Sequence, residues 1–185
     1  MKIEQIPGLY YVANYITQDE GSELMTYFTS TKEWKGISKH QSSRQVIQYG
    51  YDYPYDSKST IKKTEAIPQF LLDLVKPERV NKIINEELLK TEMEQLIINK
   101  YEENQKISPH IDHVKYFGDV IVCITLGHGT DAIFTQNNKQ IKIPLAKNSI
   151  YIMSDDARYK WTHEMKQITG KRISLTYRTI VDKYK

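Results

Sequence analysis

Residues 172–178 read Arg-Ile-Ser-Leu-Thr-Tyr-Arg, and they carry the most information about the architecture and its ligand. Successive residues of a strand face opposite sides, so Ile173, Leu175 and Tyr177 are expected to face an apolar core. The other face is then shared by Arg172, Ser174, Thr176 and Arg178. Two arginines pointing inward from a central strand are costly without anionic partners. A ligand with two carboxylates would supply them, since a guanidinium binds a carboxylate in fork geometry.

Further short β-rich runs precede this one and are separated by turn signals such as Gly127-His128-Gly129. The six expected strands are Gln95–Tyr101, Asp119–Leu126, Ala132–Thr135, Gln140–Pro144, Ser149–Met153 and Arg172–Val181. Strands of this length and spacing predict a double-stranded β-helix, or jelly roll.

The N-terminal half mixes helix and loop. Thr17 to Glu20 form a capping box, and the helix that follows should place Leu24, Tyr27 and Phe28 on one face. Pro68 can start a second helix, whose buried stripe would be Phe70, Leu71, Leu74 and Val75. We therefore expect an α+β protein with one domain over residues 1–185. Residues 1–92 would form a helical and lid region, and residues 93–185 the jelly-roll core.

Composition excludes several classes of protein. The chain has 185 residues and 26% charged residues, which is typical of one folded domain. The lone Cys123 cannot form an internal disulfide, which indicates a reducing compartment. No apolar run has the 18 residues that a membrane helix needs. We expect a monomer in the cytoplasm, or in the nucleus if the cell is eukaryotic, with no membrane partner.

Two further motifs fall on the expected β-core. In His110-Ile111-Asp112 the first and third residues point the same way on an extended chain, so one imidazole and one carboxylate converge. The opposite sheet of a jelly roll would bring His163 to the same point. Two histidines and one carboxylate form the facial triad of non-haem Fe(II) oxygenases, which leaves three coordination positions open.

Each feature alone has a simpler interpretation. A His-x-Asp tripeptide arises by chance, a downstream histidine often lies on the surface, and two strand arginines can form ordinary salt bridges. Their order on one predicted β-core favours the metal site.

These motifs resemble those of the AlkB family of Fe(II)- and 2-oxoglutarate-dependent dioxygenases. The resemblance covers residues 93–181 and is carried by Asn99-Lys100-Tyr101, His110-Ile111-Asp112, Ser154 to Tyr159, His163 and Arg172 to Arg178. It implies that His110, Asp112 and His163 ligate Fe(II). It also implies that 2-oxoglutarate is bound by Asn99, Tyr101, Arg172, Ser174 and Arg178, with Arg172 on the distal carboxylate and Arg178 near the metal-proximal one.

The resemblance also implies the reaction. 2-Oxoglutarate and O2 are consumed, succinate and CO2 are released, and a substrate C–H bond is hydroxylated. An N-methyl group hydroxylated in this way leaves as formaldehyde, which amounts to demethylation.

A tyrosine run suggests how a substrate is recognised. Tyr49, Tyr51, Tyr53 and Tyr55 alternate along a segment beside Arg44, which predicts a lid over the site. The alternative is a tyrosine-rich strand packed on the core. We expect the substrate residues to be Arg44, Tyr49, Tyr51, Tyr53, Arg158 and Trp161. Trp161 would stack on a base, or else pack in the core.

The run Gln48–Tyr53 is most similar to the AlkB homologues that act on tRNA. DNA-repair members often have an acidic residue two positions after the iron-binding Asp, where this chain has Val114. The preceding His113 is either a substrate contact or an exposed loop residue.

Three functions follow. The first is oxidation of an alkylated or otherwise modified base in DNA or RNA, with the base single-stranded or flipped out. The second is oxidation of a protein side chain or a small molecule by the same core. The third is a non-catalytic nucleic-acid-binding module, which the intact set of ligand residues argues against.

Overall fold

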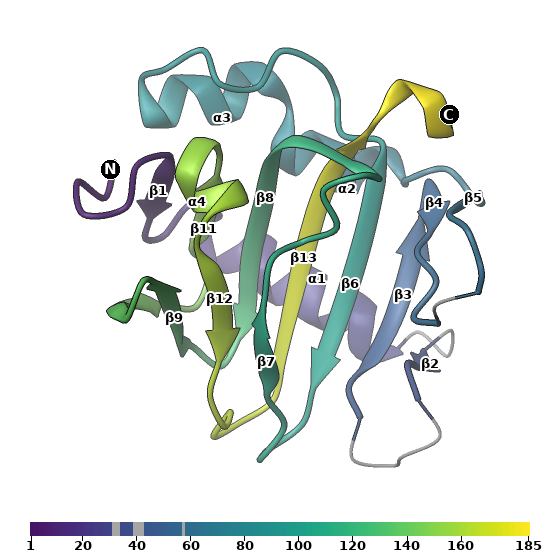
Figure 1. Ribbon diagram of the computed structural model, residues 1–185. Helices are drawn as coiled ribbons and strands as arrows, with labels where there is room; N and C mark the ends of the chain where they lie inside the picture. The colour runs from purple at the N-terminus through teal and green to yellow at the C-terminus, as the bar shows by residue number, and fades with distance from the viewer. Residues whose placement is uncertain (31–33, 39–42, 57) are drawn as a thin grey trace.

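The computed structural model describes residues 1–30, 34–38, 43–56 and 58–185 (Figure 1). In chain order its elements are β1 (Leu9–Val12), α1 (Gln18–Ser30), β2 (Lys35–Gly36), β3 (Gln45–Tyr49), β4 (Tyr51–Asp52), β5 (Lys62–Lys63), α2 (Gln69–Leu72), η1 (Asp73–Val75), α3 (Pro77–Ile84), β6 (Gln95–Tyr101), β7 (Ile107–His110), β8 (Phe117–Gly127), β9 (Thr130–Gln136), β10 (Lys139–Leu145), β11 (Ile150–Met153), α4 (Asp155–Tyr159), β12 (Thr162–Met165), β13 (Arg172–Ile180) and η2 (Asp182–Tyr184). Within these ranges no helix is both long enough and apolar enough to cross a membrane.

Two antiparallel sheets form the core. The larger has seven strands in the order β1-β11-β8-β13-β6-β3-β2, and the smaller has four in the order β10-β9-β12-β7. Figure 1 shows α1 behind the larger sheet and β7, β9 and β12 in front of it. Apolar side chains of α1, η1 and α3 pack on the helix side of the larger sheet. This arrangement confirms the predicted jelly-roll core with a helical cover.

Strand β13 lies inside the larger sheet and divides two environments. It pairs with β6 on one side and β8 on the other along most of its length. Ile173, Leu175 and Tyr177 join the helix-side apolar cluster, as expected. The alternate residues of β13 are equally buried, and they face the space between the two sheets.

The capping box of α1 forms as predicted. The Glu20 N–H donates to Thr17 Oγ1 at 3.1 Å, and the Thr17 N–H donates to the Glu20 carboxylate at 2.8 Å. Leu24 and Phe28 are buried, but Tyr27 is 41% exposed, so its place on the buried face was wrong. Phe70 of α2 is likewise 44% exposed and packs edge-on against Tyr27 at the surface.

Two short strands of the smaller sheet were not among the six expected ones. β7 and β12 have four residues each, and their sequences are polar, with Pro109 inside β7. They pair with each other, and β12 also pairs with β9. In this register His163 lies directly opposite His110.

The tyrosines at 49, 51, 53 and 55 do not share one face, which corrects the expected lid. Gly50 has φ +75° and turns the chain between β3 and β4, so the alternation breaks. Tyr49 is buried in the helix-side cluster, and Tyr51 is buried in a separate small cluster. Of the four, only Tyr53 and Tyr55 line the cavity beside His110. We call residues 51–55 the lid segment.

Gly50→Ala is expected to lower the free energy of unfolding by more than about 2 kcal/mol. A Cβ on Gly50 would overlap the carbonyl oxygen of Glu94 in a left-handed backbone conformation. Urea denaturation measures the change. Gly36→Ala is the control, because Gly36 is exposed and its φ is not positive, and it should change stability by less than about 0.5 kcal/mol. Equal losses in the two variants would contradict the prediction.

Candidate active site

His110, Asp112 and His163 come together between the two sheets. One possible ligand atom of each residue lies within 4.8 Å of the others. The ring centroids of His110 and His163 are 4.3 Å apart, because the two residues face each other across β7 and β12. Asp112 follows β7 by two residues and is buried. The predicted triad can therefore hold one metal ion.

The Asp112 carboxylate is fixed by an arginine. Its Oδ2 accepts a hydrogen bond from Nε of Arg178 at 2.9 Å and lies 2.9 Å from Nη2 of the same guanidinium, in an ion pair. Its Oδ1 lies 3.4 Å from Nε2 of His110. Burial alone would raise the pKa of Asp112, but the Arg178 charge and the neighbouring His110 and His163 hold this pKa well below its usual range. Asp112 is thus ionised, with one oxygen held and the other directed toward the histidines.

Both histidines are prepared for metal binding. Burial, together with the neighbouring His110, lowers the pKa of His163 to about 3, so its imidazole is neutral near pH 7. Nδ1 of His110 lies 2.9 Å from the Ser108 carbonyl oxygen. A proton on that nitrogen would leave the Nε2 lone pair for an ion. Among the described residues, Nδ1 of His163 has no hydrogen-bond partner although it is buried.

Arg172 is fully buried with part of its guanidinium unpaired. Its Nη2 donates to Thr125 Oγ1 at 3.1 Å. Its Nε and Nη1 have no partner within the described part of the chain. The guanidinium carbon lies 5.5 Å from the centre of the Tyr101 ring, and Tyr101 lines the cavity beside the triad. Unpaired buried donors are costly, and a bound carboxylate would satisfy both.

The remaining residues predicted to bind the cosubstrate form one polar chain. Asn99 and Ser174 face each other on β6 and β13, and Nδ2 of Asn99 donates to Ser174 Oγ at 3.4 Å. Nε of Arg44 donates to Oδ1 of Asn99 at 2.9 Å. Arg44, which the sequence assigns to the substrate, thus also contacts a predicted cosubstrate residue.

Gln95 was not predicted. It is fully buried, and its Oε1 accepts a hydrogen bond from Nη1 of Arg178 at 2.9 Å. Gln95 therefore helps to orient the arginine that holds Asp112. The pairing of β6 with β13 places Gln95 directly opposite Arg178. A single glutamine at the start of a strand belongs to no motif that would single it out.

The triad lines a cavity of about 420 Å³, which we call the iron cavity, together with Asn99, Tyr101, Ser174 and Arg178. The partly or largely exposed residues of its lining include Arg44, Tyr53, Tyr55, Lys106 and His113, and we call these five the mouth. The Tyr53 and His113 rings are 6.3 Å apart. His113 also stacks on Tyr116 at 4.1 Å. The mouth is therefore aromatic and cationic.

Besides Tyr49 and Tyr51, two more of the predicted substrate residues lie outside this cavity. Trp161 is 3% exposed and packs in the apolar cluster between the sheets, so the structure favours the core interpretation and corrects the base-stacking one. Arg158 is 1% exposed on α4, and its guanidinium bonds to backbone carbonyls of the chain that follows Asp112. Burial at that depth corrects its assignment as a substrate residue.

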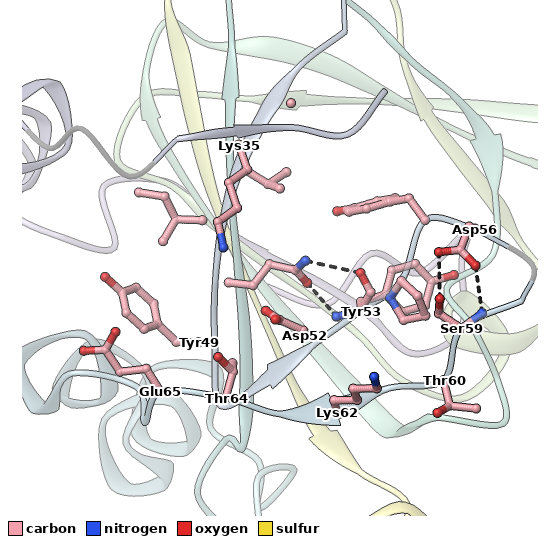
Figure 2. A pocket seen from close by; sticks show the side chains of 16 residues that line it. Lys35, Tyr49, Asp52, Tyr53, Asp56, Ser59, Thr60, Lys62, Thr64 and Glu65 are labelled. Carbon is pink, nitrogen blue, oxygen red and sulfur yellow. Dashed lines mark hydrogen bonds between the residues drawn. The ribbon is translucent and has the colours of Figure 1, made fainter. Parts of the chain in front are cut away.

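A second cavity, of about 620 Å³, shares Tyr53 and Tyr55 with the iron cavity and is shown in Figure 2. Lys35, Tyr49 and other side chains of β2 to β5 line it. Here the Gln48 side chain accepts from the Tyr53 N–H at 2.8 Å and donates to the Tyr53 carbonyl at 3.2 Å. This pair of bonds fixes the lid segment against β3 and thereby sets the position of Tyr53.

The residues present fit Fe(II) and 2-oxoglutarate. Two neutral imidazoles and one ionised carboxylate form a nitrogen and oxygen donor set suited to Fe(II). The unpaired donors of Arg172 would take the distal carboxylate of the cosubstrate. When bound, the two groups supply hydroxylation of a C–H bond coupled to oxidation of 2-oxoglutarate to succinate and CO2, while the protein supplies orientation.

Comparison with known proteins agrees with this site. The sequence profile of the 2OG-Fe(II) oxygenase superfamily matches residues 8–178. Protein L905 of Acanthamoeba polyphaga mimivirus is 29% identical over 196 residues, covering 97% of this chain and 88% of that protein. The tRNA (carboxymethyluridine(34)-5-O)-methyltransferase alkbh8 of Xenopus tropicalis is 32% identical over 161 residues. That match covers 85% of this chain but 25% of the frog protein, so the chain spans about a quarter of its length.

The solved structure of OsALKBH1 has the same fold. It matches with a TM-score of 0.77 and 16% identity, and the match covers 94% of this chain and 97% of that one. Because the profile extends from β1 to the second strand arginine and the structure brings a His-Asp-His triad together within that range, the chain belongs to the 2OG-Fe(II) oxygenase superfamily, as an AlkB-like Fe(II)- and 2-oxoglutarate-dependent dioxygenase.

Proposed function

We propose that this dioxygenase oxidises modified bases in nucleic acid, by hydroxylating an alkyl group on a single-stranded or flipped-out base. The observation that carries the proposal is the mouth, where rings of Tyr53, Tyr55 and His113 stand beside the cations Arg44 and Lys106. An extruded base stacks on aromatic rings, and the phosphates of its strand follow basic side chains.

The frog relative supports a nucleic acid substrate, since its name describes a methyltransferase acting on tRNA. Val114 is 52% exposed, and its aliphatic side chain offers a flipped base neither a charge nor a ring. His113 lines the iron cavity instead, and we assign it to contact the base.

A panel of methylated DNA and RNA oligonucleotides tests the proposal. Each is incubated with Fe(II), 2-oxoglutarate and the protein, and formaldehyde, succinate and oligonucleotide mass are measured. Loss of a methyl group or gain of one oxygen atom in any oligonucleotide is the expected result. Succinate formation with every oligonucleotide mass unchanged would contradict the proposal and leave the oxygenase core intact.

Tyr53→Ala is expected to raise KM for the best oligonucleotide by about tenfold. Stacking of one base on an aromatic side chain contributes about 1–3 kcal/mol, and Tyr53 is the lid residue with ring contacts to His113 and Phe117. Turnover of 2-oxoglutarate without substrate should persist, because Tyr53 contacts none of the triad. Steady-state kinetics on both reactions measures the effect.

Tyr27→Ala is the matched control. Tyr27 is also a partly exposed tyrosine with two ring neighbours, but it lies on α1 behind the larger sheet. Its removal should leave KM for the oligonucleotide unchanged. If Tyr53→Ala behaves in the same way as Tyr27→Ala, the lid segment does not contact the base.

A further inference from the structure

The guanidinium of Arg158 is buried among backbone carbonyls, and no carboxylate of the described chain forms an ion pair with it. It projects from α4 into the turn that joins β7 to β8. Its acceptors are the carbonyl oxygens of Asp112 (2.8 Å), Gly118 (3.1 Å), Phe117 (3.2 Å) and His113 (3.5 Å). A single side chain thus gathers four main-chain groups, the first of which belongs to a predicted iron ligand.

We propose that Arg158 is a positioning residue for the oxygenase reaction, which fixes the main chain of Asp112 and so places its carboxylate at the metal. The two ends of Asp112 are then held by two different arginines. Arg178 binds the carboxylate, while Arg158 binds the carbonyl of the same residue. With both ends held, Asp112 has little freedom to move away from His110 and His163.

The geometry requires a guanidinium. Its donors lie in one rigid plane and point outward in different directions, so they can reach carbonyls on several sides of the group at once. A lysine ammonium at this depth would supply three donors at a single point. Three further bonds hold the turn: the Phe117 N–H donates to the His113 carbonyl at 3.2 Å, the Tyr116 N–H donates to Nδ1 of His113 at 3.2 Å, and the Tyr116 carbonyl accepts from the Val181 N–H at 2.9 Å. Arg158, with four bonds, contributes more of them than any other side chain.

The same turn carries part of the wall of the iron cavity. The Phe117 ring lies 4.5 Å from the guanidinium carbon of Arg178 and 5.5 Å from the Tyr53 ring. If the turn moved, Asp112 would move with it. The Phe117 ring, which packs against Arg178 and Tyr53, would also be displaced. This linkage predicts that loss of Arg158 weakens metal binding first, whichever substrate the enzyme uses.

The test measures metal binding rather than activity. Apo Arg158→Met and apo Arg158→Lys are titrated with Co(II), and the dissociation constant and the visible absorption spectrum of the bound ion are recorded. We expect Arg158→Met to bind Co(II) about tenfold more weakly or worse, with an altered spectrum, as for other residues that orient a ligand. Arg158→Lys should fall between this variant and the parent.

Val80→Ala separates positioning from general loss of stability. Val80 is fully buried on α3 in the helix-side cluster, so its truncation lowers the melting temperature away from the iron cavity. Its Co(II) affinity and spectrum should match the parent. Parent-like Co(II) binding by folded Arg158→Met would overturn the proposal, as would equal weakening in Val80→Ala. If Arg158→Met does not fold, parent-like Co(II) binding by Arg158→Lys would overturn it.

Discussion

Asp112→Ala is expected to abolish 2-oxoglutarate turnover and to weaken metal binding by at least about 100-fold, beyond the range typical of residues that only orient a ligand. It should also destabilise the metal-free protein. The Arg178 guanidinium would stay buried without its carboxylate, and breaking a buried ion pair costs about 3–5 kcal/mol. Succinate formation, Co(II) titration and urea unfolding of the apo protein measure these effects.

His110→Ala is the matched comparison, because it removes a predicted metal ligand without breaking the Asp112–Arg178 ion pair. It removes another ligand and should abolish turnover equally. Its ring is partly exposed, with Nδ1 at 2.9 Å from the Ser108 carbonyl oxygen and Nε2 at 3.4 Å from the Asp112 carboxylate, so apo stability should change by less than about 1 kcal/mol. Turnover retained by Asp112→Ala would refute the metal assignment. Equal apo stability of the two variants would refute the structural part of the argument.

Arg172→Met is expected to weaken 2-oxoglutarate binding by about 30-fold or more, since losing one partner of a buried charge pair costs at least about 2 kcal/mol. Co(II) affinity should stay at the parent value, because Arg172 contacts none of the triad. The apo protein should be as stable as the parent or more stable, since the substitution removes two unpaired buried donors. Anaerobic calorimetry with Co(II) present measures the cosubstrate affinity.

Arg79→Met controls for the loss of an arginine. Arg79 binds Glu20 through both terminal nitrogens, at 3.0 and 3.2 Å, in an ion pair between α1 and α3. Its removal should leave 2-oxoglutarate affinity unchanged and should not stabilise the protein. Parent-like 2-oxoglutarate affinity in Arg172→Met would remove this arginine from the cosubstrate site.

The strand with the two arginines was predictable because its two faces differ so strongly. A period of two in apolar and polar residues fixes which side chains point together, whatever the strand pairs with. β6, β8, β9, β10 and β11 were found because their runs contain apolar, often β-branched residues. The fold class followed from the number and spacing of these runs.

The strands that carry the histidines were not predictable as strands. β7 and β12 are short and polar, with no apolar alternation, and they exist because they pair with each other and with β9. The ligands were nevertheless found, since a His-x-Asp spacing and a downstream histidine are chemical signals independent of strand propensity. The metal-binding residues were therefore easier to identify from the sequence than the strands β7 and β12 beside them.

The lid and Arg158 show where sequence reasoning fails. The tyrosine alternation was read as one continuous strand, but the left-handed turn at Gly50 sends neighbouring tyrosines into different clusters. Arg158 was assigned to the substrate. Its partners are main-chain carbonyls, which every residue possesses and which leave no trace in the sequence. Contacts of that kind become visible only when the chain is folded.

Because the two faces of β13 differ so strongly, a shift in its register would be incompatible with a packed core. A slip of one residue against β6 and β8 would turn Arg172 and Arg178 into the helix-side cluster and turn Leu175 toward the cosubstrate. Such a molecule would bury charge against hydrocarbon and could not remain compact. The chain can therefore pack its core only when β13 is correctly aligned. The same alignment places both arginines on the cosubstrate side, so core packing and the anion-binding half of the active site form together.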